Sequence, residues 1–271
     1  MNTLQNGSTG GEVTMLQRAL SVLGYTIGID GDYGPGTAAV VTQFQTDKGL
    51  TANGVAAPDT WSIIDSLAPQ GMDISHNNDA INWDDLTPHI QFVYCKYSES
   101  AGFNDREFDT YIAKIKQKSL MMGAYHFFDF QSPAQDQASN FLACGLDFSD
   151  KANVLPPMID LETESDYLRD NKDACVQSIT DWISAVSTQT GRTPVIYTFK
   201  WFWNEYLAGT PQFGSNPLWI SAFQPQSPGI PPEWDKYTIW QYSQNGPLPG
   251  TSGDVDQDIF NGTLAQLKSL A

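Results

Sequence analysis

The first 67 residues place apolar side chains at the spacing of one face of a helix. Val13, Leu16 and Leu20 recur three and four residues apart and mark a first helix. A second helical stretch covers residues 37–49, and a third begins near Pro58. This pattern predicts a small all-α unit of three helices.

The two segments between these helices share one design, in which an Asx-Gly pair is followed by a small residue and a threonine. An Asx-Gly pair favours a tight turn with positive φ, and a threonine hydroxyl can cap the next helix. We therefore predict two turn-then-helix units related by an internal repeat, with the threonines as caps. The units are Asp30-Gly31-x-x-Gly34-x-x-Thr37 and Asn53-Gly54-x-x-Ala57-x-x-Thr60.

From Gly71 onward the pattern changes to short β-rich runs separated by helical stretches, including residues 107–118, 133–144 and 171–190. Alternating strands and helices over about 200 residues predict a parallel sheet closed into a β/α barrel of the TIM type. The last three runs lie too close together for crossover helices, so we expect an irregular final third. The runs are residues 92–98, 121–128, 155–162, 193–199, 217–223, 237–243 and 255–260.

The composition changes at Ala68-Pro69-Gln70, which predicts a short linker between two domains. We expect a three-helix domain over residues 1–67, a linker at 68–70 and the barrel over 71–271. The predicted fold class is α/β, an irregular TIM-like barrel with a small N-terminal all-α domain.

Polar and aromatic residues gather at the ends of the predicted strands. In parallel barrels the carboxyl ends of the strands form one mouth, where catalytic groups converge. Packing alone does not explain so many carboxylates and aromatic side chains on one rim, so the sequence predicts a site there. The residues are Asp73, Lys96, Glu99, Tyr125, His126, Asp160, Glu162, Tyr197, Trp240, Gln241, Tyr242 and Asp256.

Asp160-Leu161-Glu162 places two carboxyls at the end of one strand. Residues i and i+2 of a strand share a face, with Cα atoms about 6.5–7 Å apart. Repulsion and desolvation then raise the pKa of one of the two groups and leave the other ionised. A proton donor beside a carboxylate is the equipment for cleaving a glycosidic bond.

Within residues 9–67 a specific set of positions forms one pattern. The positions are Gly11-x-Val13-x-x-Leu16-Gln17-x-x-Leu20, Leu23-Gly24-Tyr25, Asp30-Gly31-x-x-Gly34-x-x-Thr37, Val41-x-x-Phe44-Gln45, Gly49-Leu50 and Gly54-x-x-Ala57-x-x-Thr60-Trp61. This pattern resembles the three-helix peptidoglycan-binding domain, although Ala57 stands where that family usually has glycine. The resemblance implies that bacterial peptidoglycan is the partner.

The larger unit carries matching segments from end to end. They are Gly71-Met72-Asp73-Ile74-Ser75, 92–99, Gly123-Ala124-Tyr125-His126-Phe127, 157–162, Pro194-Val195-Ile196-Tyr197-Thr198, Leu218-Trp219-Ile220-Ser221, Trp240-Gln241-Tyr242-Ser243 and 255–260. These segments resemble glycoside hydrolase family 25, the N-acetylmuramidase type of lysozyme. The resemblance implies hydrolysis of the β-1,4 bond between N-acetylmuramic acid and N-acetylglucosamine, without a metal or another cofactor.

The resemblance also assigns roles to residues. It implies that Glu162 is the general acid, and we expect Asp160 beside it to stay ionised and to raise the pKa of Glu162. Asp73 and Asp256 are the other pocket carboxylates that the resemblance implies. The expected substrate-binding residues are Lys96, Glu99, Tyr125, Tyr197, Trp219, Trp240, Gln241 and Tyr242.

Charge limits the possible partners. The chain has 14 Lys and Arg against 31 Asp and Glu, a formal net charge of −17. Such a field repels nucleic acids and anionic membranes, and no apolar run is long enough to span a bilayer. The N-terminus shows no Sec signal. We therefore expect a monomer made in the cytoplasm that reaches the cell wall through a holin, a dedicated secretion machine or lysis.

Other chemistries fit less well. A zinc amidase needs closely spaced ligands, and His76, His89 and His126 form no such pattern. The acidic run at 254–258 lacks the glycine and the closing glutamate of an EF-hand. The three cysteines sit in apolar surroundings and are expected to be inert. The remaining alternative, a non-catalytic wall-binding protein on a hydrolase scaffold, is disfavoured because all four pocket carboxylates are present.

Overall fold

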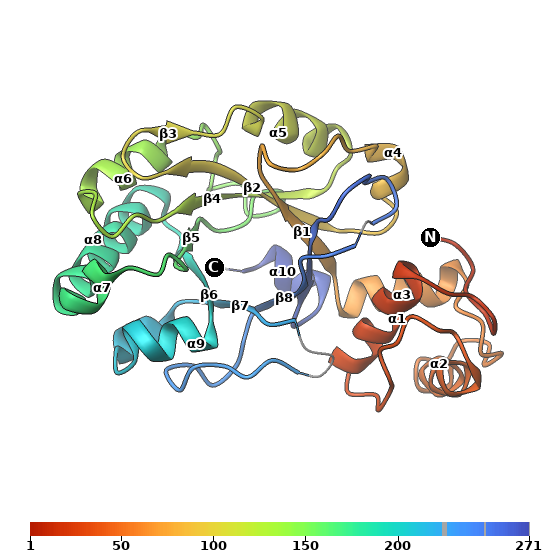
Figure 1. The fold of residues 1–271 in the computed structure, drawn as a ribbon. Coiled ribbons are helices and arrows are strands. Elements are labelled where there is room, and N and C mark those ends of the chain that lie inside the picture. The colour runs from red at the N-terminus through yellow and green to blue at the C-terminus, as the bar shows by residue number, and fades with distance from the viewer. Residues whose placement is uncertain (224–226, 247, 271) are drawn as a thin grey trace.

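The computed structural model describes residues 1–223, 227–246 and 248–270, and it shows a three-helix unit packed beside an α/β barrel (Figure 1). The helices of the N-terminal unit are α1 (Gly11–Val22), α2 (Pro35–Asp47) and α3 (Pro58–Leu67). The prediction of three helices is confirmed.

A buried glutamine on α1 holds the turn that precedes α2. Gln17 Oε1 accepts from the backbone N–H groups of Asp30 (3.0 Å) and Gly31 (2.9 Å). Gln17 Nε2 donates to Asp30 Oδ1 (2.8 Å) and to the Thr37 hydroxyl (3.1 Å). One side-chain amide therefore satisfies the turn and ties it to both neighbouring helices.

The second turn repeats this arrangement one helix later. Gln45 Oε1 accepts from the N–H groups of Asn53 (3.0 Å) and Gly54 (2.9 Å). Gln45 Nε2 donates to Asn53 Oδ1 (3.2 Å) and to the Thr60 hydroxyl (3.0 Å). The predicted internal repeat is therefore a repeat of structure, and its organising residues are the two glutamines.

The prediction of positive φ in both turns is confirmed, since φ is 75° at Gly31 and 68° at Gly54. The prediction that threonines cap the helices is wrong. The N-cap positions are Gly34 and Ala57, and neither makes a side-chain cap hydrogen bond. Thr37 and Thr60, which we expected as caps, lie inside the first turns, where their hydroxyls are used by the glutamines.

Eight strands close the barrel in the order β1-β2-β4-β5-β6-β7-β8-β9, and β9 pairs with both β8 and β1. Strands β1 to β8 of this ring run parallel, while β9 is antiparallel to both neighbours; a short strand, β3 (Phe103–Asn104), pairs antiparallel with β2. The ring strands are β1 (Gln70–Ile74), β2 (Phe92–Glu99), β4 (Met121–Phe127), β5 (Met158–Asp160), β6 (Val195–Phe199), β7 (Leu218–Ser221), β8 (Ile239–Ser243) and β9 (Asp256–Phe260).

Helices surround the first part of the ring, and in the described residues no α-helix separates β7, β8 and β9 (Figure 1). The predicted irregular final third is therefore confirmed. The helices are α4 (Trp83–Leu86), α5 (Phe108–Gln117), α6 (Ala134–Leu142), α7 (Asp166–Asp170), α8 (Lys172–Thr190), α9 (Lys200–Phe202) and α10 (Leu264–Lys268), with a π-turn at Trp203–Leu207 and a 3-10 turn at Pro211–Ser215. None is both long enough and apolar enough to cross a membrane, among the described residues.

Strand β5 is shorter than the predicted run of residues 155–162. It covers Met158–Asp160, and it begins only at Met158 because the two prolines before it have no N–H group to donate to a neighbouring strand. Glu162 therefore lies beyond the strand end, on the segment that leaves the barrel mouth.

Aromatic rings fill the barrel interior next to glycines. A Cβ atom on Gly71 would lie 2.3 Å from ring atoms of Phe92, and one on Gly123 would lie 2.3 Å from the Tyr94 ring. These two glycines therefore leave the space that the rings from β2 occupy. The interior is packed below the mouth and is open only at its upper end.

The two units share a buried contact. The Arg18 guanidinium of α1 lies 4.5 Å from the ring centre of Trp240 and 5.1 Å from that of Tyr242, both on β8. The predicted linker is not a loose connection: Ala68 is buried, Pro69 O accepts from the Phe260 N–H (2.9 Å), and Gln70 is already the first residue of β1.

Candidate active site

Four carboxyl side chains meet at the barrel mouth. Asp73 lies on β1, Asp160 ends β5, and Glu162 follows two residues later. Asp256 begins β9, and because that strand is antiparallel, its first residue lies at the same end as the last residues of the others. Asp73 and Asp256 are direct partners in the β1–β9 ladder, so their side chains share a face.

A polar network orients the first of these carboxyls. Gln241 Nε2 donates to Asp73 Oδ2 (2.9 Å). The amide oxygen of Gln241 accepts from the hydroxyls of Tyr197 (2.9 Å) and Ser221 (2.8 Å). Two donors on the oxygen fix the amide orientation, so its N–H is aimed at Asp73.

Burial raises the pKa of all four carboxyls. The pKa values of Asp73 and Asp160 lie well above the ordinary range, through desolvation and then repulsion from the other carboxylates. Desolvation raises the pKa of Asp256 to about 6. Desolvation and then repulsion from Asp256 raise the pKa of Glu162, which Lys96 partly opposes. The four groups therefore do not all carry charge at neutral pH.

These pKa shifts correct the protonation state that we predicted for Asp160 beside Glu162. We predicted an ionised Asp160 that raises the pKa of its neighbour, but Asp160 is the more buried of the two and its own pKa is strongly raised. Asp256 from β9 also raises the pKa of Glu162, so the repulsion at Glu162 does not come from its strand neighbour alone. Glu162 lies past the strand end and is partly exposed, whereas Asp160 points into the barrel.

Lys96 is the cation next to these carboxyls. Its Nζ lies 2.6 Å from Glu99 Oε2 and 4.6 Å from the ring centre of Phe127. Its charge lowers the pKa of both Asp160 and Glu162, which places it close to the pair. Glu99 therefore contributes by holding Lys96 in position at the rim.

Tyr125 also belongs to the interior face of the site. The phenol is nearly buried, and repulsion from Asp73, Asp160, Asp256 and Glu162 adds to desolvation in raising its pKa. Together with Tyr197 it forms the aromatic wall of the carboxyl pocket.

Four predicted rim residues do not reach this pocket. Trp240 and Tyr242 flank Gln241 on β8 and therefore point to the outer face, where they pack against Arg18. His126 also points outward; its ring nitrogens lie 2.8 Å from Ser98 Oγ and 3.0 Å from Gln137 Oε1. Trp219 points inward but is fully buried beneath the pocket.

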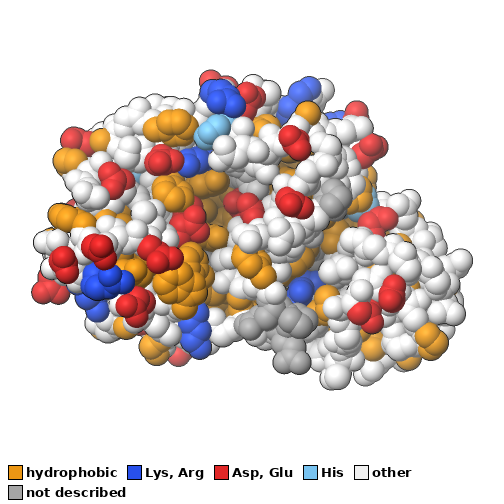
Figure 2. Space-filling view, viewed as in Figure 1, with side chains coloured by type: hydrophobic (Ala, Val, Ile, Leu, Met, Phe, Trp, Pro, Cys, Tyr) orange, Lys and Arg blue, Asp and Glu red, His pale blue; other side chains and the backbone are white. Residues whose placement is uncertain are grey.

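Two exposed aromatic residues at the site were not predicted. A pocket of about 410 Å³ is lined by Glu162 and Tyr197 together with Trp201 and Phe223. The last two are 50% and 51% exposed, which is unusual for side chains of this size. Hydrophobic and acidic side chains border a hollow on this face of the molecule (Figure 2). The available signal was their position, since Phe223 ends the predicted run 217–223 and Trp201 lies two residues after the run 193–199.

The comparisons with known proteins match both units. Residues 72–251 match the family described as Glycosyl hydrolases family 25, and residues 9–64 match the Putative peptidoglycan binding domain. The chain is 30% identical over 248 residues to Lysozyme M1 of Streptomyces globisporus, covering 89% of this chain and 83% of that protein. The chain belongs to glycosyl hydrolase family 25.

Two further similar proteins support this family assignment. N,O-diacetylmuramidase of Arthroderma benhamiae is 31% identical, over 80% of this chain and 92% of that protein. The crystal structure of the bacterial lysozyme from Streptomyces coelicolor superposes with a TM-score of 0.71 at 30% identity, covering 75% of this chain and 96% of that one. The chain is therefore a glycosidase of the lysozyme and muramidase type with a peptidoglycan-binding domain, as the sequence predicts.

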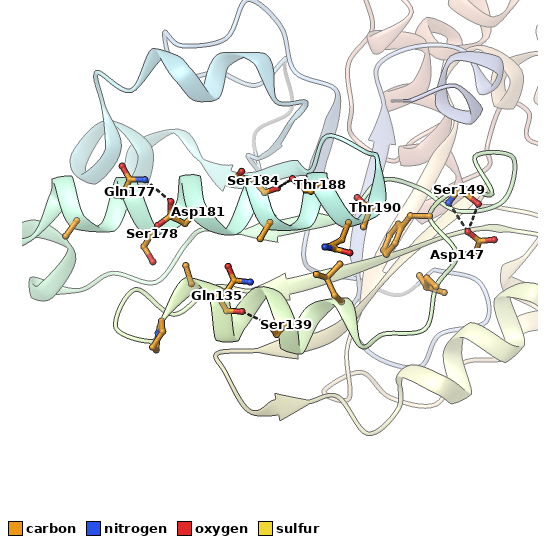
Figure 3. Close-up of a pocket in the computed structure, with 18 residues that line it drawn as sticks. Gln135, Ser139, Asp147, Ser149, Gln177, Ser178, Asp181, Ser184, Thr188 and Thr190 are labelled. Atoms are coloured by element: carbon orange, nitrogen blue, oxygen red, sulfur yellow. Dashed lines mark hydrogen bonds between the residues drawn. The ribbon is translucent and has the colours of Figure 1, made fainter.

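A larger groove of this family 25 chain lies away from the carboxyls, between α6 and α8 (Figure 3). Its polar side chains bond within their own helices: Gln177 donates to Asp181 (2.8 Å), and Thr188 donates to the backbone oxygen of Ser184 (2.8 Å). None of the predicted site residues lines it. The groove is therefore not the catalytic site.

Proposed function

We propose that this chain hydrolyses the β-1,4 bond between N-acetylmuramic acid and N-acetylglucosamine in peptidoglycan, with Glu162 as the proton donor. The observation that carries the proposal is the position of Glu162. Glu162 and Asp256 are both partly exposed and both have raised pKa values, but Glu162 is the carboxyl that shares a pocket with two exposed aromatic side chains. Such side chains suit the apolar faces of sugar rings.

The chemistry follows from these positions. A protonated Glu162 donates to the glycosidic oxygen as the bond breaks, and the negative charge that the other carboxyls share stabilises the oxocarbenium-like transition state. We propose that Asp160 either attacks the anomeric carbon or orients the acetamido group of the substrate for attack. A covalent glycosyl-enzyme seen by mass spectrometry would assign the attack to a carboxylate, and inhibition by a thiazoline analogue without such an adduct would assign it to the acetamido group.

The bond specificity is tested by the reducing ends of the products. After digestion of purified cell walls, borohydride reduction and mass spectrometry should find new reducing ends on muramic acid. New ends on glucosamine, or released stem peptides with intact glycan, would contradict the proposal. We propose that one chain acts as a monomer on the wall, in the periplasm or outside the cell, because it contains all four carboxyls itself.

Asp256→Asn should move the pH profile of activity. The charge of Asp256 raises the pKa of Glu162, so its removal lowers that pKa. A general acid is active only while protonated, and the descending alkaline limb of kcat/KM should therefore shift to lower pH. Asp235→Asn removes an equal charge from the exposed surface and should leave the limb in place. An unmoved limb in the first variant would show that Glu162 is not the group whose titration sets it.

Removal of the N-terminal module should separate binding from cleavage. The truncation has to begin at Ala68, because Pro69 and Gln70 take part in the β1 region of the barrel. We expect activity on short soluble muropeptides to persist, and activity on intact walls to fall by about 100-fold or more through lost avidity. The truncated protein exposes Trp240 and Tyr242, so circular dichroism must confirm its fold. Equal loss on both substrates by a folded protein would make the module part of the catalytic unit.

A further inference from the structure

A fifth carboxyl lies directly beneath the four at the mouth. Asp258 follows Asp256 by two residues on β9, so it points to the same interior face, and it is fully buried. In the β1–β9 ladder it lies opposite Gly71, next to the Asp73–Asp256 pair. A buried carboxyl at this place needs a specific set of partners to be tolerated.

The two oxygens of Asp258 have different surroundings. Oδ1 accepts a hydrogen bond from the indole N–H of Trp219 at 3.0 Å. Oδ2 is buried and has no donor among the described residues, while the carboxyl faces Asp73 at hydrogen-bonding range. Two carboxyl oxygens in a dry interior attract each other only when one of them carries a proton.

The donors around the pair decide where the proton belongs. Asp73 accepts from Gln241 at its Oδ2 and lies nearer the mouth, where a charge can act on substrate. Asp258 has Trp219 as its neutral donor and is sealed from solvent. A proton on Asp258 lets it donate to Asp73, which then accepts from both sides and carries the single negative charge of the pair.

We propose that Asp258 is a positioning residue that stays protonated and donates a hydrogen bond to Asp73, so that Asp73 is held as an oriented carboxylate at the floor of the site. The proposal rests on the proposed function of the pocket. Desolvation and repulsion from Asp73 and Asp256 raise the pKa of Asp258, in agreement with a neutral form. Two further titratable groups have pKa values that the charge of Asp258 raises: Tyr94 of β2 on the interior face, and Tyr242 on the outer face of β8.

Two substitutions separate this role from simple packing. Asp258→Val removes the donor to Asp73, whose pKa then rises, so kcat/KM should fall by about 10- to 100-fold and its acidic limb should move to higher pH. Asp258→Asn keeps an acceptor for Trp219 and supplies an N–H to Asp73. It should recover most of the lost activity and restore the acidic limb. Equal, severe loss in both variants would show that Asp258 acts as an anion, and wild-type profiles in both would show that it only fills space.

A spectroscopic measurement keeps the test independent of activity. At neutral pH the infrared spectrum of the intact protein should contain the C=O stretches of several protonated carboxyls, and the difference spectrum against Asp258→Asn should show that one of them is lost. A difference spectrum without this loss would overturn the proposal even if Asp258→Val does not fold. Because the spectrum needs no substrate, it also distinguishes this failure from failure of the proposed hydrolysis, which the reducing-end analysis tests.

Discussion

Glu162→Gln should lower turnover on purified cell walls by about 10²- to 10⁴-fold, the contribution typical of a positioned general acid. The substitution removes the proton and almost no volume, and Glu162 lies past the end of β5, where its side chain supports no strand pairing. Folding and wall binding should therefore be unchanged. The measurement is the rate of turbidity loss of purified walls, together with a wall-pelleting assay for binding.

Glu164→Gln is the matched control, since it changes an exposed glutamate two residues further along the same segment. It should retain the activity of the unmodified chain. If Glu162→Gln keeps near-normal turnover across the pH profile, another group donates the proton. Asp256 would then be the next candidate, because it lies at the same mouth and its pKa is raised to about 6.

Much of the fold could be predicted because its signals are local. Apolar spacing located the three N-terminal helices, and the alternation of runs located the barrel and its irregular end. The ends of β5 were not predictable in the same way. We predicted one run over residues 155–162, yet the two prolines delay the start of the strand to Met158, and it ends at Asp160. A hydrophobicity pattern does not show where missing N–H groups interrupt strand pairing.

The residues of the site could be predicted only in part, for a different reason. The carboxyls were found because each one lies at or near the end of a predicted strand, but Trp240 and Tyr242 were assigned to the mouth together with Gln241, as one segment. Side chains alternate along a strand, so when Gln241 faces the interior its two neighbours face outward. The same rule applied to β9 would have put Asp258 on the face of Asp256. Which face is the interior is set by tertiary packing, here by the helix that carries Arg18.

The N-terminal module therefore packs against the barrel, in addition to the wall binding that we propose for it. Outer-face aromatics that would otherwise meet solvent are covered by α1, and the short connection is buried at both ends. A module docked in this way approaches the wall in a fixed orientation to the cleft. Its own stability then decides whether that orientation persists.

Gln45→Leu should destabilise the module by about 3 kcal/mol or more, because each buried N–H left without an acceptor costs about 1–3 kcal/mol. Leucine is apolar and one atom shorter, and it cannot accept from Asn53 and Gly54 or donate to Thr60. Such a loss is a large part of the stability of an ordinary small domain, which is about 5–15 kcal/mol. Amide hydrogen exchange of the turn at residues 53–55 reports the change, since that turn should lose its protection first.

Gln43→Leu is the control on the same helix. Gln43 is exposed, so an equal change in hydrophobicity and helix propensity there should leave exchange in the turn unaltered. Gln17→Leu should reproduce the effect of Gln45→Leu at the other turn, because the two amides make the same set of bonds. If Gln45→Leu exchanges no faster than Gln43→Leu, the hydrogen bonds of the glutamine do not hold the repeat together, and the apolar contacts of the three helices must do so alone.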